Sequence, residues 1–349
     1  MTKTGAIGLA LASAALFGAS TPAAKLLLGV ISPWMLAGLL YVGSGLGLGA
    51  TVLIRRWTGS QTQAPLRGAD LPWLAGAVVF GGLVGPVLLM LGLSVTPASS
   101  AALLLNLEGL ATMAIAWIVF RENVDRRLLL GALAILAGAA ILSWSGATLG
   151  ALPVGALLIA GACLAWGVDN NLTRKISGAD PMVIAATKGL VAGPISLAIG
   201  LMQGAAAPAP TAMAGAAVVG LLGSGVSLVC FILALRHLGA ARTGAYFSTA
   251  PFVGAVLGVV FLAEPLTLWL ALAAGLMALG VWLHLTEVHA HEHAHETLEH
   301  EHAHVHDEHH RHDHAPGDPA GEPHTHRHRH APLIHSHPHY PDLHHRHGH

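Results

Sequence analysis

Glu108 is the residue whose type and position most directly suggest chemistry. It lies near the middle of the stretch 103–122, LLLNLEGLATMAIAWIVFRE, which is apolar and long enough to cross a bilayer and also carries Asn106. A carboxylate at that depth costs roughly 2.5 to 3.5 kcal/mol, so it is kept where a partner, a water-filled cavity or a substrate offsets the cost. We interpret Glu108 as a site for a substrate amine or a proton, with Asn106 beside it. A structural ion pair with another span is the alternative.

Other polar residues interrupt later apolar stretches. Lys188 could receive a substrate carboxylate, pair with Glu108 or Asp169, or extend to the membrane surface. Asp169 and Asn170 either line the same site or mark the end of a helix near that surface. Tyr246 supplies a hydroxyl and is a further candidate for substrate binding. A bare divalent cation usually requires several ligands, so this small set favours an organic solute or a metal chelate as cargo.

The end of the chain carries a different signal, because residues 287–349 contain 23 of the 25 histidines and no apolar run. Neutral imidazoles bind zinc, nickel, copper and cobalt, and His-rich tracts are typical of metal binding. A solvated spacer or a purification tag is the alternative, although the irregular spacing argues against a tag. The candidate metal ligands are His289, His291, His293, His295, His300, His302, His304, His306, His324, His326, His328 and His330.

The composition indicates that these residues are positioned by membrane-spanning helices. Of the 349 residues 54% are hydrophobic and only 10% are charged, which is typical of a polytopic membrane protein. No catalytic constellation is present, so an enzyme is not expected, and neither is nucleic-acid binding. Apolar windows predict ten membrane-spanning helices at about 5–28, 33–54, 71–93, 97–120, 127–145, 152–174, 181–203, 212–235, 241–262 and 266–285.

The distribution of Lys and Arg predicts the orientation of these spans. Alternate loops contain basic residues, including Arg55, Arg126 and Arg174, whereas the loops between them contain none. By the positive-inside rule, both termini are cytoplasmic. Residues 287–349 cannot bury a core and are predicted to be a disordered cytoplasmic tail.

The membrane domain also repeats itself. Phe17-Gly18 aligns with Trp166-Gly167 at an offset of 149 residues, and Gly81 aligns with Gly223 at an offset of 142. Two five-helix halves must run through the membrane in opposite directions. Inverted repeats of this kind are characteristic of secondary transporters, whose substrate site lies near the midplane between the halves. The predicted domains are 1–145, 146–286 and the tail 287–349.

These features resemble the EamA-type transporters of the drug/metabolite transporter superfamily. The resemblance covers residues 5–285 and rests on three motifs in particular: the two aromatic-Gly pairs, Phe120-Arg121-Glu122, and Leu262-Ala263-Glu264-Pro265. It implies export of amino acids or other metabolites across a bacterial inner membrane. Glu122 and Glu264 match the family pattern at span ends, and we interpret both as structural, satisfying nearby backbone amides. Glu108-Gly109 departs from the pattern, since the other half has Ala250-Pro251 there.

Three functions remain open from the sequence. The first is a secondary transporter that exports a small, amino-acid-like organic metabolite by alternating access. The second is an efflux protein for a transition metal (Zn, Ni or Co) or a metal chelate, with the tail collecting or sensing the metal. The third is a membrane-anchored metal buffer. No cofactor is required by the first function, although the tail could hold Zn, Ni, Co or Cu. The expected partners are a small molecule, divalent metals and the lipid bilayer, and a homodimer is compatible with the sequence.

Overall fold

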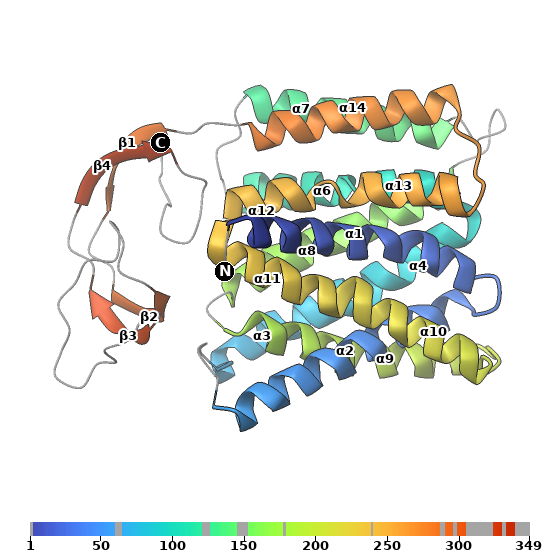
Figure 1. Ribbon diagram of the computed structural model, residues 1–349, viewed down its shortest axis with the longest axis horizontal. Helices are drawn as coiled ribbons and strands as arrows, with labels where there is room; N and C mark the ends of the chain where they lie inside the picture. Colours follow the sequence, from blue (N-terminus) through green and yellow to red (C-terminus); the bar gives the residue numbers. More distant parts are fainter. Residues whose placement is uncertain are drawn as a thin grey trace.

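A computed structural model describes residues 3–59, 65–120, 126–144, 153–176, 179–238, 240–286, 290–295, 299–304, 324–329 and 333–338. The chain forms an all-α membrane domain followed by a tail with short strands (Figure 1). The helices lie side by side along one direction, and the chain enters and leaves the bundle at the same end (Figure 1). We call this the termini end of the bundle and the opposite one the distal end.

The first half contains seven α-helices and two short helices of other types. The α-helices are α1 (Lys3–Leu27), α2 (Pro33–Trp57), α3 (Leu71–Ala77), α4 (Gly85–Val95), α5 (Ala98–Leu104), α6 (Leu107–Phe120) and α7 (Arg126–Trp144). The 3-10 helix η1 (Gly68–Asp70) precedes α3, and the π-helix η2 (Val78–Val84) joins α3 to α4.

The second half has the corresponding elements. They are α8 (Val154–Lys175), α9 (Pro181–Met202), α10 (Pro210–Gly220), the π-helix η3 (Leu221–Val226), α11 (Ser227–Leu238), α12 (Ala240–Phe247), α13 (Ala250–Phe261) and α14 (Leu268–Leu285). These bounds agree with the spans predicted from the sequence to within a few residues. Among the described residues, nine helical segments are apolar and long enough to cross a membrane. The remaining predicted span forms α8, whose end carries Asp169, Asn170 and two basic residues.

Two spans in each half are interrupted, and at equivalent positions. The third and eighth spans each pass through a π-helix, η2 and η3. The fourth span breaks between α5 and α6, and the ninth breaks between α12 and α13. Pro86 and Pro251 lie in the first turns of α4 and α13, where their missing N–H groups cannot continue the preceding helix. Discontinuous helices at matching places in inverted repeats are where transporters build their central sites.

Glycines permit the closest helix contacts, again in matching places. A Cβ on Gly167 of α8 would lie 2.8 Å from that of Ala111 on α6. A Cβ on Gly18 of α1 would overlap the Ala250 carbonyl at the start of α13. The glycine of each aromatic-Gly pair therefore lets the opening helix of its half pack directly on an interrupted span. Gly45 and Gly189 likewise allow the backbones of α2 and α9 to come into close contact.

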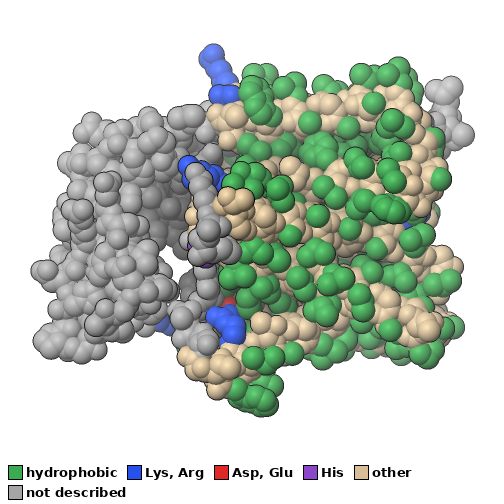
Figure 2. Space-filling view, in the orientation of Figure 1, with side chains coloured by type: hydrophobic (Ala, Val, Ile, Leu, Met, Phe, Trp, Pro, Cys, Tyr) green, Lys and Arg blue, Asp and Glu red, His purple; other side chains and the backbone are tan. Residues whose placement is uncertain are grey.

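The largest buried cluster joins both halves, with Leu36, Leu93, Leu103, Ile159 and Met277 almost fully inaccessible. Outside it, hydrophobic side chains cover the visible face of the bundle (Figure 2). Lys and Arg side chains gather mainly at the termini end (Figure 2). An apolar belt with basic groups at one end is what a lipid-facing surface requires.

In the tail, the described backbone forms four strands: β1 (Ala290–His295), β2 (Glu299–His304), β3 (His324–Arg329) and β4 (Leu333–Pro338). β1 pairs with β4 and β2 with β3, each as an antiparallel two-stranded ribbon. Ala290 lies opposite Pro338 in the first ribbon, and Glu299 lies opposite Arg329 in the second. Ribbons of only two strands are marginally stable in water by themselves.

Candidate functional site

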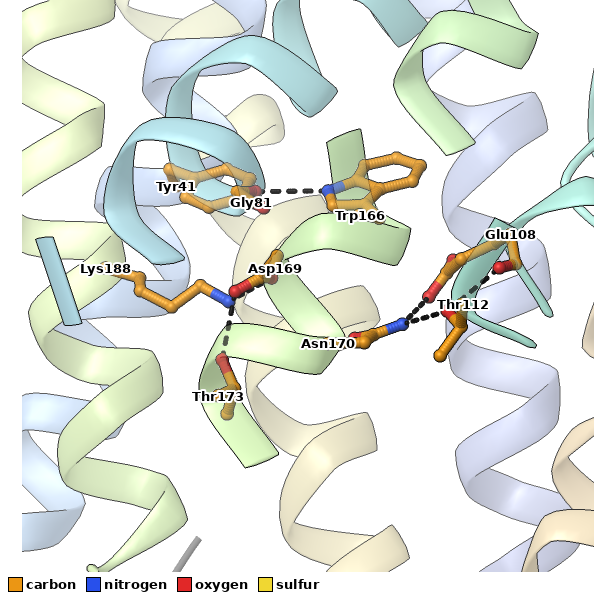
Figure 3. Close-up of polar contacts among 9 residues, drawn as sticks. All are labelled: Tyr41, Gly81, Glu108, Thr112, Trp166, Asp169, Asn170, Thr173 and Lys188. Carbon is orange, nitrogen blue, oxygen red and sulfur yellow. Dashed lines mark hydrogen bonds and ion pairs between the residues drawn. The ribbon is translucent and has the colours of Figure 1, made fainter. Parts of the chain in front are cut away.

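Nine residues from both halves form a polar group inside the bundle, which we call the central cluster (Figure 3). They come from α2, η2, α6, α8 and α9. The members are Tyr41, Gly81, Glu108, Thr112, Trp166, Asp169, Asn170, Thr173 and Lys188.

Lys188 of α9 forms an ion pair with Asp169 of α8. The Lys188 Nζ lies 2.5 Å from the Asp169 Oδ2, and the two side chains are only 16% and 7% exposed. Thr173, one helical turn after Asp169, donates its hydroxyl to Oδ1 at 3.0 Å. Both oxygens of this buried carboxylate therefore have partners. Of the roles predicted for Lys188, the structure shows the pairing with Asp169.

Glu108 lies on the other side of α8 and has a different environment. Its Oε1 accepts a hydrogen bond from the Asn170 Nδ2 at 3.0 Å, and the same nitrogen donates to the Thr112 Oγ1 at 3.1 Å. Asn170 is exposed although it lies inside the bundle, and Glu108 is half-buried. Among the described residues, no Lys or Arg lies within ion-pair distance of Glu108. Its position in the first turn of α6 places the carboxylate at the positive end of that helix.

The backbone of η2 completes the cluster. The N–H of Gly85 bonds to the Phe80 carbonyl, and Pro86 has no N–H, so neither usual helical donor reaches the Gly81 carbonyl. Two side chains replace them: the Tyr41 hydroxyl donates to this oxygen at 2.6 Å and the Trp166 Nε1 at 3.1 Å. The proline thus leaves the Gly81 carbonyl available to side chains of α2 and α8, whose hydrogen bonds connect these helices to η2.

Glycine is required at position 81 because of Asp169. A Cβ on Gly81 would overlap the Asp169 carboxylate, whereas a Cβ on Gly109 would meet no atom within 4 Å. We expect Gly81→Ala to destabilise the protein by about 1 to 3 kcal/mol through overpacking. Gly109→Ala, the matched control, should be neutral or slightly stabilising. Thermal unfolding in detergent checks both, and equal melting temperatures for the two variants would contradict the close packing of η2 on Asp169.

Two residues predicted for the site lie apart from the central cluster. Asn106 is 9% exposed in the break before α6, where its Nδ2 donates to the Leu103 carbonyl and lies 3.9 Å from the Met277 sulfur of α14. Tyr246 packs against a small apolar cluster of α1 and α11 residues. The structure therefore gives Asn106 a contact with its own helix break and Tyr246 a packing role.

The sequence interpretation missed Tyr41, Thr112 and Thr173. The two threonines could have been found, since Thr112 follows Glu108 by four residues and Thr173 follows Asp169 by four, which places each pair on one helix face. Tyr41 depends on the geometry of η2, for which only the nearby Pro86 was a signal.

Of the two glutamates interpreted as structural, Glu264 accepts the backbone N–H groups of Ala98 and Ser99 at 2.6 and 2.8 Å. Glu122 lies outside the described residues.

No three His, Cys, Asp or Glu side chains gather into a metal site in the part of the chain that was described. Of the predicted tail ligands, His289, His306 and His330 fall outside it. The other nine lie on β1, β2 and β3, for which only the backbone is described.

The central cluster is built to bind and not to break bonds. It holds two carboxylates and one ammonium group, and the ammonium is committed to Asp169. The remaining negative charge, on Glu108, can be balanced by a cationic group of a ligand or by a proton. Its neighbour Asn170 is exposed, so this side of the cluster is less tightly enclosed than the Asp169 side.

Comparison with known proteins agrees with this architecture. Residues 4–144 and 153–286 each match the EamA-like transporter family. An uncharacterized transporter from Methanothermobacter thermautotrophicus (strain Delta H) is 26% identical over 281 residues, which cover 76% of this chain and 82% of the relative. A protein described only as a crystal structure aligns with a TM-score of 0.60 at 19% identity, over 81% of this chain and 96% of its own, which shows a shared fold. The chain belongs to the EamA-like transporter family and is a multi-pass membrane transporter, not an enzyme.

Proposed function

We propose that this transporter exports a small organic metabolite that carries an amino group, and that Glu108 binds this group. The supporting observation is the environment of Glu108: a half-buried carboxylate inside the bundle, hydrogen-bonded by Asn170 and without an ion-pair partner among the described residues. Intramembrane carboxylates of this kind are costly and usually functional. The resemblance to amino-acid exporters points to an amino-acid-like cargo.

The amino-acid-like part of the proposal has a structural consequence. Lys188 is the cation of the central cluster, and Asp169 already holds it. A zwitterionic substrate would have to share Lys188 with Asp169 or present its carboxylate to Asn170 and Thr112. Amines without a free carboxylate therefore belong in any substrate screen beside the amino acids.

Alternating access is the mechanism that the fold supports. The interrupted spans α5–α6 and α12–α13 are related by the repeat, and the first of these carries Glu108 at its break. Rocking of one half against the other would expose such a midplane site to each side in turn. We place the termini end in the cytoplasm of a bacterial cell because basic side chains gather there.

A transport screen tests this function. Proteoliposomes loaded with single amino acids, simple amines or divalent metal salts are assayed for release, with Glu108→Gln protein in parallel. The expected result is release of one class of amino compound by the parent protein and not by the variant. Release that is equal in the two proteins would reject Glu108 as the binding group, and release of metal ions alone would favour the efflux of metals.

The tail supports a second, separate proposal: its histidines bind a transition metal on the cytoplasmic side. We expect the full chain to bind Zn²⁺ or Ni²⁺ and a chain lacking 287–349 to lose most of that capacity, measured by equilibrium dialysis. Binding needs neutral imidazoles, whose ordinary pKa is about 6.5, so affinity should fall as the pH drops below about 6.5. Unchanged metal binding by the shortened chain would contradict this, and so would an affinity at pH 5.5 equal to that at neutral pH.

Metal resistance of cells distinguishes a tail that serves transport from one that acts only as a buffer. If the metal serves transport, loss of the tail and Glu108→Gln should both abolish resistance to the same metal. If the tail acts only as a buffer, loss of the tail should lower metal resistance while Glu108→Gln leaves it intact.

A further inference from the structure

The distal end of the bundle contains a group of contacts that the central cluster does not use. The turn between α4 and α5, residues 93–99, is a distal turn whose backbone groups are bound by side chains from far along the chain. Lys25 of α1 donates from its Nζ to the carbonyls of Leu93, Ser94 and Thr96, at 2.6, 3.2 and 2.9 Å. The Glu264 carboxylate accepts from the N–H groups at the start of α5.

These long-range caps matter because the turn caps the two helices only weakly by itself. The residue before α5 is Pro97, which has no side-chain acceptor for the first N–H groups of that helix. Of the last α4 carbonyls that Lys25 binds, that of Leu93 also accepts the Thr96 N–H, but only at 3.4 Å. A cation at the end of one helix and an anion at the start of the next also match the two helix dipoles.

Glu264 crosses between the repeats. It follows α13 of the second half and binds α5 of the first half, 166 residues away in sequence for Ala98. Ala263, just before it, has φ of 54°, a left-handed conformation that is costly for a residue other than glycine. Strained residues of this kind occur where the surroundings fix them, and they are frequent at switching elements.

The two ends of the interrupted spans differ in packing. At the distal end α5 lies against α13, since a Cβ on Gly258 would lie 2.8 Å from the Ser99 nitrogen and one on Gly254 would lie 2.9 Å from the Ala102 Cβ. Toward the termini end, α6 and α12 share at most marginal contact among the described residues. The exposed Asn170 also lies on this side, near the end of α8. The two interrupted spans therefore pack closely on each other at the distal end and much less toward the termini end.

We propose that Lys25 and Glu264 form a latch that holds the distal end closed and is released when the transporter opens to the outside. The distal turn lies near the membrane surface, where water can take over its N–H and carbonyl groups after release. Closed and open states can then interconvert without leaving buried polar groups unsatisfied. The proposal rests on the alternating-access function, but it concerns the gate and not the cargo.

Sided labelling of a cysteine tests the latch without any substrate. The reporter is Asn170→Cys in a background where Cys163 and Cys230 are alanine, and it is treated with a membrane-impermeant maleimide in right-side-out and inverted vesicles. Glu264→Gln keeps one acceptor oxygen, and we expect it to raise labelling from the distal side about tenfold, which corresponds to the loss of one charge-assisted hydrogen bond. Lys25→Met removes all three bonds to the turn and should raise distal labelling at least as much. Labelling from the termini side should fall in return.

Asp180→Asn is the matched control. Asp180 also accepts a helix N-terminal amide, from Met182 at 2.9 Å, and its other oxygen pairs with Arg55 of α2 at 3.3 Å. It therefore joins the two halves as Glu264 does, but at the termini end. Unchanged distal labelling in both latch variants would overturn the proposal. So would an increase from both sides, or an equal increase in Asp180→Asn, because these results mean general loosening. If the latch variants change the labelling as expected but no amino compound is released in the transport screen, the latch is supported and the proposed cargo is rejected.

Discussion

Replacing Glu108 by glutamine is expected to lower transport at low substrate concentration by about 10- to 150-fold, the loss that corresponds to about 1.5 to 3 kcal/mol for a hydrogen bond to an ionised group. Glutamine keeps the size of the side chain and can still bond to Asn170, so the cluster should stay folded. What it loses is the negative charge, which forms no direct ion pair with a Lys or Arg among the described residues. Uptake or release of the identified amino compound in proteoliposomes provides the measurement.

Glu108→Asp and Asn170→Asp sharpen this experiment. Aspartate at position 108 keeps the charge on a shorter side chain and should retain part of the activity. Aspartate at position 170 puts a carboxylate oxygen about where the Asn170 Nδ2 now lies, 3.0 Å from the Glu108 Oε1. The repulsion between the two like charges should lower transport. Full activity in Glu108→Gln, with wild-type affinity, would show that the substrate binds elsewhere.

The large-scale fold was accessible from the sequence because its signals are strong in a membrane. Long apolar windows defined the spans, and the positions of Arg55, Arg126 and Arg174 set their alternation. A segment that crosses lipid must be helical, because lipid offers no hydrogen-bond partner to an unpaired backbone group. A long apolar window therefore predicts a helix directly. The repeat of the aromatic-Gly pairs then fixed the arrangement in two halves, and Gly18 and Gly167 make equivalent close contacts in the structure.

The interruptions inside the spans were only partly accessible. Pro86 and Pro251 indicate that a helix must change there, but a proline does not say whether the chain forms a π-helix, as in η2, or a break, as before α13. The choice depends on tertiary partners. In η2 the freed Gly81 carbonyl is tolerated because Tyr41 and Trp166 donate to it from two other helices.

Most charged and amide residues of the site could be predicted from the sequence, but the contacts between them could not. Charged and amide side chains in apolar spans identified Glu108, Asp169, Asn170 and Lys188. Which of the two carboxylates Lys188 would bind was left open, because it depends on how α9 is rotated against α8. Glu264 shows the same limit: its acceptor role was expected from its position at a span end, whereas its partners in the opposite repeat could come only from the packed structure.

The ion pair between Asp169 and Lys188 leads to the second large effect. Removing one partner leaves a buried charge uncompensated, which typically costs about 3 to 5 kcal/mol. We expect Lys188→Met to show this cost in full, because the Asp169 carboxylate is short, 7% exposed and held against η2. Asp169→Asn should cost less, since the long Lys188 side chain can move its ammonium group toward the membrane surface.

The double variant Asp169→Asn/Lys188→Met distinguishes this charge effect from a loss of packing. A neutral pair of similar volume should recover most of the stability that Lys188→Met loses, because a buried ion pair repays little beyond its own desolvation. Thr173→Val, which removes only the 3.0 Å bond to Asp169 Oδ1, should cost about 1 kcal/mol. Thermal unfolding in detergent, followed by tryptophan fluorescence, ranks the four proteins. If the double variant is as unstable as Lys188→Met, the loss arises from packing and the ion pair contributes no specific stability.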